Sequence, residues 1–341
     1  MGVTIEHWGE YQNHEILRYT LSSGGLKVKI LNFGAIIQSL VFKNTDLVLG
    51  FDNFEGYIID KSHQGAAIGR YANRINKGRF TLNRKEYQLK CDARGQHIHG
   101  GPHGFDRRFW NAVVIANEDY PTVRFSINSP DGDQGYPGNL NFSVTYKVTK
   151  KQELIIIYEG ISDSDTLLNP TNHSYFNLNG GGDISETEIQ ISADFITPVD
   201  ERIIPTGGLL DISNTPFDFR KGAKIGERIN ICHEQLSLTG GFDHNFVLNN
   251  KGCAAKAYSE KSGIQMTCFT DMPGLQFYTA NKLNEEGGKN NMPLKPQNGF
   301  CMETQFFPDS PNHPEFPSAV IKKQSEFVSK TIYQFKDRDE I

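Results

Sequence analysis

Short runs in which apolar and polar residues alternate, separated by turn residues, fill most of this chain of 341 residues. Alternation with a period of two is typical of β-strands that have one buried face. The run RFTLNRKEYQL (79–89) alternates on both sides of Asn83 and is predicted as a β-hairpin. The run NFSVTYKVTKKQELIIIYEG (141–160) has two strongly apolar halves around a short charged turn, and it is predicted as a second hairpin.

Further runs of the same kind occur along the chain. They are LKVKIL (26–31), AIIQSLVF (35–42), TVRFSIN (122–128), TEIQISA (187–193), HNFVLNN (244–250), AAKAYSE (254–260), GIQMTCFT (263–270), LQFYT (275–279) and KTIYQF (330–335). Helical periodicity is weak, and the best candidate for a helix is the segment 222–231. The pattern predicts an all-β protein, a large antiparallel β-sandwich with few short helices.

The length of the chain would allow about two domains. However, no Pro- or Ser-rich linker divides it. The least hydrophobic segment, NEEGGKNNMPLKPQNG (284–299), is interpreted as a surface loop between strands. We therefore expect one domain over residues 1–341.

Charge and cysteine content narrow the class of protein. The formal net charge is −5 and like charges do not form long runs, so the sequence does not predict binding to nucleic acid or to an acidic membrane surface. No apolar window approaches the length of a membrane span, and the N-terminus lacks a signal-peptide pattern. The 5 cysteines are odd in number and scattered, which favours reduced thiols in the cytosol.

Several segments break the strand pattern and concentrate unusual chemistry, as loops on a rigid scaffold often do. They are GRYANRI (69–75), QHIHGGPHGFDRRFW (96–110), NPTNHSYFNLNG (169–180), TGGFDHNFVL (239–248) and CMETQFFPDSPN (301–312).

The second of these segments is rich in histidine. His97 and His99 are two residues apart, so on a strand they would share a face. With His103 and Cys91 nearby, a zinc site is one hypothesis. The spacing matches no common zinc motif, and the two glycines after His99 remove side chains where ligands would lie. Loop histidines bonded to the backbone are the simpler interpretation.

Three charged residues each have two interpretations. Arg74 follows Asn73 among apolar neighbours, so it is either a surface charge or a partly buried cation that binds an acceptor. Asp243 either forms an Asx turn before a strand or is a fixed acceptor for hydroxyl groups. Glu303 interrupts the apolar run FCMETQFFP, where burial would raise its pKa, so it is either a structural acid or a general base. In PGLQFYT, the aromatic residues Phe277 and Tyr278 either present a ring to a ligand or belong to the core, and the pattern favours the core.

Taken together, the motifs NFGAIIQSL, GRYANRI, HGG, TNHSYFNL, GFDHNF, PGLQFYT and ETQ resemble the aldose 1-epimerase family in their order and spacing. Each motif is weak alone, but their succession over nearly the whole chain is specific. The resemblance implies a single large antiparallel β-sandwich that interconverts the α and β anomers of free aldoses such as galactose and glucose. It also implies a small-molecule aldose as the partner, and no metal or coenzyme.

The resemblance further assigns roles to single residues. His173 in TNHSYF matches the general acid, Glu303 in ETQ matches the general base, and His99 in HGG matches a residue that positions the sugar and the acid. The residues that match contacts to sugar hydroxyls are Asn73, Arg74, Asp243 and Gln276. His97 and the segment 308–318 remain unassigned.

These residue types suit the reaction. Opening a cyclic hemiacetal requires a base for the proton of the C1 hydroxyl and an acid for the ring oxygen, and glutamate and histidine can serve because their pKa values are tunable toward neutrality. In NPTNHSYFNLNGGGD (169–183), the Asn and Gly residues are expected to form rigid turns that fix His173. Tyr175 and Phe176 are expected to anchor this loop in the core.

Alternative functions remain open at this point. A non-catalytic sugar-binding protein would be indicated by loss of His173 or Glu303, and both are present. A glycoside hydrolase needs two carboxylates, for which Asp243 and Glu303 are candidates. A hexose-6-phosphate epimerase needs cations for the phosphate, and the motifs offer Arg74 and at most Arg70. The sequence leaves open which aldose is preferred and whether the chain is a monomer or a weak homodimer.

Overall fold

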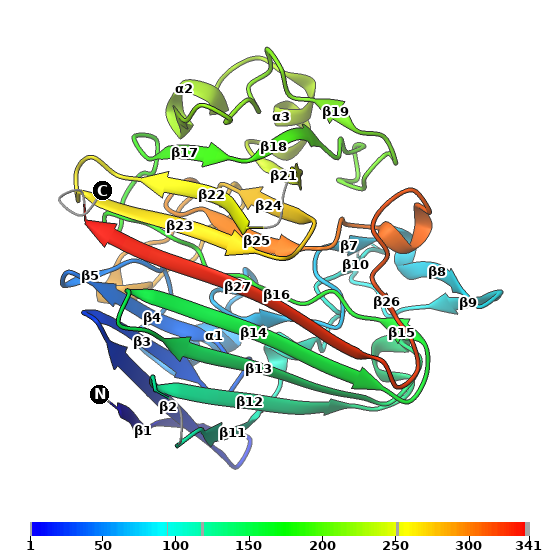
Figure 1. Ribbon diagram of the computed structural model, residues 1–341, viewed down its shortest axis with the longest axis horizontal. Coiled ribbons are helices and arrows are strands. Elements are labelled where there is room, and N and C mark those ends of the chain that lie inside the picture. The colour runs from blue at the N-terminus through cyan, green and yellow to red at the C-terminus, as the bar shows by residue number, and fades with distance from the viewer. Residues whose placement is uncertain (1, 94, 117–118, 250–251, 338–341) are drawn as a thin grey trace.

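The computed structural model describes residues 2–93, 95–116, 119–249 and 252–337, and it consists mainly of β-strands (Figure 1). Asn250, the last residue of the predicted run 244–250, lies outside the described residues. The long strands pair in an antiparallel manner. Among the described residues, no helix is long and apolar enough to cross a membrane.

The largest sheet has nine strands in the order β11-β12-β13-β14-β27-β23-β22-β17-β20. Their bounds are Asn111–Val114, Thr122–Ser129, Leu140–Val148, Glu153–Ser162, Glu326–Asp337, Ile264–Thr270, Gly252–Tyr258, Glu188–Ile191 and Ala223–Lys224. Along β14 every second residue is buried, and the residues between are only partly buried. One face of this sheet therefore belongs to the core, as alternation predicts.

Two five-stranded sheets pack against the large sheet. The first is formed by β1 (Gly2–Tyr11), β2 (His14–Ser23), β3 (Leu26–Leu31), β4 (Ile37–Phe42) and β5 (Thr45–Asp46). The second has the order β19 (Leu210–Asp211), β18 (Ala193–Ile196), β21 (Asp243–Leu248), β24 (Gly274–Tyr278) and β25 (Cys301–Gln305). We call this second sheet the site sheet.

A hydrophobic cluster joins all three sheets into one core. Val144 and Ile156 of the large sheet, Val28 of the first five-stranded sheet, and Phe246 and Phe277 of the site sheet all belong to it. Because this cluster lies between the large sheet and the two smaller ones, the molecule has two layers of strands. The predicted antiparallel β-sandwich is confirmed.

Buried tyrosines also link the layers. Tyr146 Oη of the large sheet donates to the carbonyl of Ala35 at 2.8 Å. Tyr333 Oη of the same sheet donates to the carbonyl of Met302 in the site sheet at 2.7 Å. Since each hydroxyl is fully buried, these bonds satisfy groups that would otherwise be costly to bury.

Both predicted hairpins are present. Strands β8 (Arg79–Leu82) and β9 (Lys85–Gln88) pair through a two-residue turn, in which Asn83 and Arg84 have φ of 52° and 64°. Two left-handed residues give the tight turn whose twist matches a hairpin. Strands β13 and β14 form the second hairpin.

Helices are few and short. They are α1 (Phe54–Ile59), α2 (Ile225–Ile229) and α3 (Glu234–Thr239), with 3₁₀ turns at Asn76–Gly78, Phe105–Arg107, Asp133–Gly135, Lys289–Asn291 and Ser310–Asn312. The predicted helix at 222–231 is real but shorter, and α1 and α3 were not predicted. None is long enough to show two full periods of a helical pattern.

Several two-stranded pairs complete the structure. They are β6 (Ala67–Ile68) with β16 (Thr171–Asn172), β7 (Arg74–Ile75) with β10 (His97–Ile98), and β15 (Thr166–Leu167) with β26 (Val320–Ile321). In Figure 1, β7 and β10 lie close together at the right of the view, near the β8–β9 hairpin. The first two pairs matter most because they carry the residues that face the site sheet.

Candidate active site

A pocket is lined by side chains of the site sheet and by residues at the ends of the pairs β6–β16 and β7–β10. The lining residues are Lys61, Ser62, His63, Asn73, Arg74, Ile98, His99, His173, Tyr175, Asp243, Tyr278, Lys282, Leu283, Glu285 and Glu303. Every site residue predicted from the sequence is among them, except Gln276.

The pairing register explains why the site sheet offers polar side chains. Asp243 of β21 pairs with Tyr278 of β24, and Gln276 of β24 pairs with Glu303 of β25. Directly paired residues, and residues two apart on one strand, point to the same face. These four side chains therefore share one face, while the fully buried Phe277 points into the core. Of the two rings in PGLQFYT, Phe277 is a core residue as the pattern favours, whereas Tyr278 lines the pocket, which is the alternative for that ring.

Gln276 lies behind Asp243 rather than in the pocket wall. Its Nε2 donates to Asp243 Oδ1 at 2.7 Å, and its Oε1 accepts from Gln305 Nε2 at 3.3 Å. The residue is buried and is not part of the lining. In this structure, Gln276 orients a lining carboxylate instead of facing the pocket directly, which differs from the sequence-based expectation.

His173 is held by the backbone and by buried asparagines. Its N–H donates to the carbonyl of Ala66, and its carbonyl accepts from the N–H of Gly65, both at 2.9 Å. Asn172 Nδ2 donates to the carbonyl of Gly65 at 2.9 Å, and Asn169 bonds backbone groups of two other segments. The polar run thus satisfies buried backbone groups, and in doing so it holds the imidazole in one position.

The aromatic pair after His173 divides between two environments. Phe176 packs against Phe300 and Tyr333 in the core, as expected. Tyr175 is also buried, but it lines the pocket, and its Oη donates to the carbonyl of Ser62 at 3.0 Å.

The HGG motif gives His99 its position. His99, Gly100 and Gly101 have φ of 50°, 85° and 95°. A Cβ on Gly100 would lie 1.8 Å from the carbonyl oxygen of Gly69, so only glycine fits there. The N–H of Asn73 donates to His99 Nδ1 at 3.2 Å. This bond occupies Nδ1 and leaves Nε2 as the nitrogen that can act in the pocket.

His97 lies outside the pocket, because β10 is only two residues long and the left-handed backbone at His99 ends the alternation. His97 Nδ1 is 2.6 Å from the carbonyl oxygen of Lys90, and Nε2 is 2.5 Å from Tyr136 Oη. Burial lowers the pKa of His97 to about 4. The prediction of a shared face for His97 and His99 is wrong. Among the described residues, these two do not join His103 in a cluster that could hold a metal.

The two arginines of GRYANRI have different surroundings. Arg70 is 2% exposed, and its guanidinium donates to the hydroxyl and carbonyl of Ser129 and to the carbonyls of Pro137 and Gly138. Arg70 is therefore a structural cation, and the suggestion that it binds a phosphate is wrong. Arg74 is only partly buried and lines the pocket.

Glu303 and His173 form a buried acid–base pair, with Glu303 Oε1 and His173 Nε2 3.8 Å apart. Among the described residues, Glu303 Oε2 has no hydrogen-bond partner. Burial and the charge of Asp243 raise the pKa of Glu303 well above its usual range, against the charge of Arg74. Burial, with the charge of His63, lowers the pKa of His173 to about 3. If the pair holds one acidic proton, these opposite pKa shifts favour its position on Glu303, which leaves Glu303 as a carboxylic acid and His173 as a neutral imidazole.

Cys301 contacts the other nitrogen of His173. Its Sγ is 3.6 Å from Nδ1, and burial raises the pKa of the thiol well above its usual range, so the thiol is neutral. The contact occupies Nδ1 and leaves Nε2 toward Glu303. Ligand atoms of His173, Cys301 and Glu303 lie within 4.8 Å of one another, a spacing that could hold a metal ion. Burial disfavours the thiolate and the carboxylate that a metal would need.

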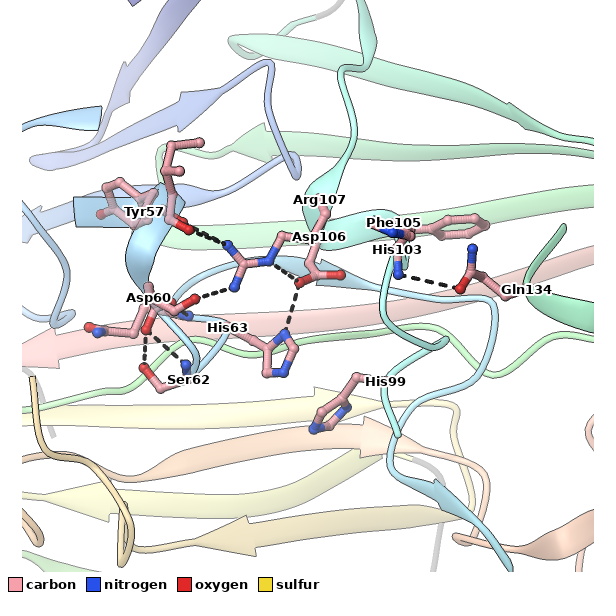
Figure 2. A network of polar contacts seen from close by, with 12 residues as sticks. Tyr57, Asp60, Ser62, His63, His99, His103, Phe105, Asp106, Arg107 and Gln134 are labelled. Atoms are coloured by element: carbon pink, nitrogen blue, oxygen red, sulfur yellow. Dashed lines mark hydrogen bonds and ion pairs between the residues drawn. The ribbon is translucent and has the colours of Figure 1, made fainter. Parts of the chain in front are cut away.

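His63 lines the pocket although no sequence motif pointed to it. It lies in the polar stretch KSHQ between α1 and β6, and its Nδ1 is 2.9 Å from Asp106 Oδ2 (Figure 2). Its ring centroid is 4.9 Å from that of His99 and 5.9 Å from that of His173. The one available signal was a histidine in a short polar stretch before a buried strand.

Comparisons with known proteins agree with this fold. A family model described as "Aldose 1-epimerase" matches residues 17–334. Galactose mutarotase of Homo sapiens is 40% identical over 329 residues, covering 93% of each chain, and aldose 1-epimerase of Escherichia coli (strain K12) is 36% identical over 326 residues, covering 92% of this chain and 93% of the relative. The crystal structure of galactose 1-epimerase from Lactobacillus acidophilus NCFM has a TM-score of 0.90 at 28% identity and 98% coverage of both chains. Similarity of this extent shows that the chain belongs to the aldose 1-epimerase family.

Proposed function

We propose that this isomerase interconverts the α and β anomers of free hexoses, galactose and glucose among them, and that Glu303 and His173 carry out the proton transfers. The proposal rests on the buried pair itself. A carboxyl group and an imidazole lie 3.8 Å apart at the pocket wall, with pKa values shifted in opposite directions. Such a pair can hold one proton and exchange it with a substrate.

The reaction opens a cyclic hemiacetal and closes it on the other face. Glu303, as carboxylate, takes the proton of the C1 hydroxyl while His173, as imidazolium, protonates the ring oxygen, and the bond between C1 and the ring oxygen breaks. The open aldehyde rotates about the C1–C2 bond. His173 then takes the proton back from the former ring oxygen as it attacks C1, and Glu303 returns its proton to the aldehyde oxygen. No net proton is consumed.

The pair therefore alternates between two forms that carry the same number of protons, placed on different residues. Ring opening starts from carboxylate and imidazolium, and ring closure starts from carboxylic acid and neutral imidazole. The pKa shifts favour the second form, so binding of a cyclic sugar has to draw the proton from Glu303 to His173. Two charges favour this transfer: Arg74 opposes the rise in the pKa of Glu303, and Asp106 opposes the fall in the pKa of His173.

The other lining residues are proposed to bind sugar hydroxyls. Asp243 accepts hydrogen bonds, and Asn73 and Arg74 lie together at the start of β7. Burial lowers the pKa of His99 well below its usual value, so the ring is neutral. Because its Nδ1 accepts from the backbone, its Nε2–H is the donor that a sugar hydroxyl would meet. Gln276 contributes by orienting Asp243.

A hexose 6-phosphate is the alternative substrate that one observation favours. Lys61 and Lys282 line the pocket together with Arg74, which is more positive charge than the motifs alone offered. Asp243 and Glu285 line the same pocket and oppose a phosphate dianion. We expect free glucose to be turned over with a higher kcat/KM than glucose 6-phosphate, and polarimetry on a fresh anomer of each sugar tests this.

The proposed reaction needs neither metal nor coenzyme. We expect the rate to survive EDTA and exhaustive dialysis, measured by polarimetry. A loss of rate that added zinc restores would instead assign a metal to His173, Cys301 and Glu303, whose ligand atoms have the required spacing. We also expect the protein to leave a nitrophenyl galactoside intact, because hydrolysis would require a second carboxylate acting at C1.

We further propose that the chain works as one domain, as a monomer or a weak homodimer, in the cytosol. All 5 cysteines are free thiols in the structure, which suits a reducing compartment. Size-exclusion chromatography with light scattering, over a range of concentrations, gives the oligomeric state.

The decisive experiment is polarimetry on fresh α-D-galactose and α-D-glucose with Glu303→Gln. Glutamine keeps the size and hydrogen-bonding capacity of Glu303 but cannot take a proton. The rate should fall by roughly 10²–10⁴ while galactose affinity, by calorimetry, and the melting temperature change little. His173→Asn should have the same effect, and the double variant should be little worse than either single one. Near-native turnover of folded Glu303→Gln would end the proposal.

A further inference from the structure

His63 is anchored from outside the pocket by a buried carboxylate. Its Nδ1 lies 2.9 Å from Asp106 Oδ2, and the same oxygen lies 3.1 Å from Arg107 Nε (Figure 2). Arg107 in turn donates to the carbonyls of Tyr57 and Ile58 at the end of α1. The imidazole is therefore held on a chain of contacts that reaches back to a helix, and its orientation is fixed.

The charge on Asp106 sets which nitrogen of His63 is available. Burial would raise the pKa of Asp106, but the charge and hydrogen bond of His63 and the charge of Arg107 outweigh it and leave that pKa lowered. Asp106 is thus an anion that accepts from Nδ1–H. Nε2 of His63 makes no hydrogen bond within the part of the chain that the structure describes. An oriented imidazole with one unused nitrogen is a recognition group.

The position of His63 brings that nitrogen to the sugar site. It lines the same pocket as the Glu303–His173 pair, and its side chain is 23% exposed, unlike the almost completely buried side chain of His173 at 6%. The centroids of His63 and His99 are 4.9 Å apart, and those of His99 and His173 are 5.1 Å apart. The three imidazoles therefore form one contiguous part of the wall, and His63 is the most exposed of the three.

We infer that His63 is a specificity-determining residue, whose Nε2 bonds one particular hydroxyl of the aldose while Asp106 holds the ring in place. The inference rests on the proposed function, because it takes an aldose as the ligand of this pocket. His63 takes no part in the proton transfers at C1. It therefore acts on which sugars bind and leaves the chemical step to the buried pair.

The test measures binding in the Glu303→Gln background, so that turnover does not interfere. Calorimetry compares the preferred hexose with its 2-, 3-, 4- and 6-deoxy analogues, in this background alone and with His63→Phe added. Phenylalanine keeps the shape of the ring and removes both nitrogens. We expect the parent hexose to bind roughly two- to twelvefold more weakly, the range of one neutral hydrogen bond. We also expect that only one deoxy analogue, the one that lacks the hydroxyl bound by His63, loses no affinity when His63→Phe is added.

Asp106→Asn should weaken binding through the same sugar hydroxyl by a similar or smaller factor, because it releases the ring of His63 without removing it. His103→Phe is the matched control, since His103 is an exposed histidine outside the pocket, and it should change nothing. If His63→Phe fails to fold, judged by its thermal melt, His63→Gln removes the ring and is tested against the same analogues.

Two outcomes would overturn the inference: an unchanged affinity for every sugar, or an equal loss for all of them with the deoxy pattern preserved. Either would make His63 a packing residue. Failure of the proposed function is distinguishable, because then no aldose would bind to the Glu303→Gln protein and the wild-type protein would not accelerate mutarotation.

Discussion

Arg74 is the lining residue with two separable effects at the scale of a single side chain. Its guanidinium can bond sugar hydroxyls, and its charge opposes the rise in the pKa of Glu303. We expect Arg74→Ala to raise KM by roughly 10- to 150-fold, since a charged hydrogen bond contributes about 1.5–3 kcal/mol. Arg84→Ala, at the exposed turn of the β8–β9 hairpin, should leave KM unchanged. Steady-state polarimetry measures both, and an unchanged KM for every aldose would make Arg74 a surface charge.

Cys301 is expected to act through the imidazole that it touches. Its Sγ lies 3.6 Å from His173 Nδ1, so Cys301→Ala should release the ring and lower kcat by roughly two- to twelvefold with little change in KM. Cys301→Ser should recover part of the rate because a hydroxyl can also bond Nδ1. Cys268→Ala is the control, since it removes another buried thiol from the core away from the pocket. If both alanine variants lower kcat equally, the contact has no catalytic role.

At the scale of elements, the site sheet holds its polar face together with a row of amides. Gln305 Nε2 donates to Asn245 Oδ1 and to Gln276 Oε1, both at 3.3 Å, and Gln276 Nε2 donates to Asp243 Oδ1 at 2.7 Å. The row crosses β21, β24 and β25 and ends at the carboxylate in the pocket wall. Its function on this reading is to hold Asp243 rigidly while the other face of the sheet packs in the core.

This row predicts a binding defect from a residue outside the pocket wall. Gln276→Met keeps the volume but removes the donor to Asp243, so we expect KM to rise by roughly tenfold or more and the melting temperature to fall. Gln38→Met is the control, since Gln38 is a buried glutamine that bonds the carbonyl of Phe51 away from the pocket. It should lower the melting temperature and leave KM alone. A Gln276→Met protein with native KM would refute the positioning role.

At the scale of the whole molecule, the buried histidines predict a strong dependence of stability on pH. Burial lowers the pKa of His97 to about 4, those of His173 and His244 to about 3, and that of His99 well below its usual value. Below the unfolded value of about 6.5, the unfolded chain binds protons that the folded chain refuses, so the free energy of unfolding falls as pH falls. Glu303 has the opposite shift and offsets one of these four protons.

We therefore expect the free energy of unfolding to fall by roughly 3–4 kcal/mol per pH unit between about pH 6 and pH 5, from three net protons at about 1.4 kcal/mol each. Urea unfolding at several pH values measures the slope. His244→Gln should reduce it by about one proton, and His14→Gln, at an exposed position, should not. A flat profile over this range would show that the buried histidines take up protons in the folded state.

Local sequence patterns were enough to predict most of the longer strands, both hairpins, the sandwich class and most of the residues proposed for the site, but not β1 and β2. Alternation with a period of two specifies which residues share a face, as it did for Glu303 and Cys301 on β25, both of which contact His173. The motif order across the chain then indicated the family and pointed to His173 and Glu303. These successes share a cause, because each depends on residues that are close together in the sequence.

Which loops face which strands depends on contacts between segments that are far apart in the sequence. His173 and Cys301 are 128 residues apart, and pairing of β7 with β10 is what brings Arg74 beside the HGG turn. Pairing of β21 with β24 brings Gln276 to Asp243, and packing of the stretch between α1 and β6 against the other segments brings His63 into the wall. The face on which a side chain lies is a local property, whereas what stands opposite that face depends on sheet register and packing between distant segments.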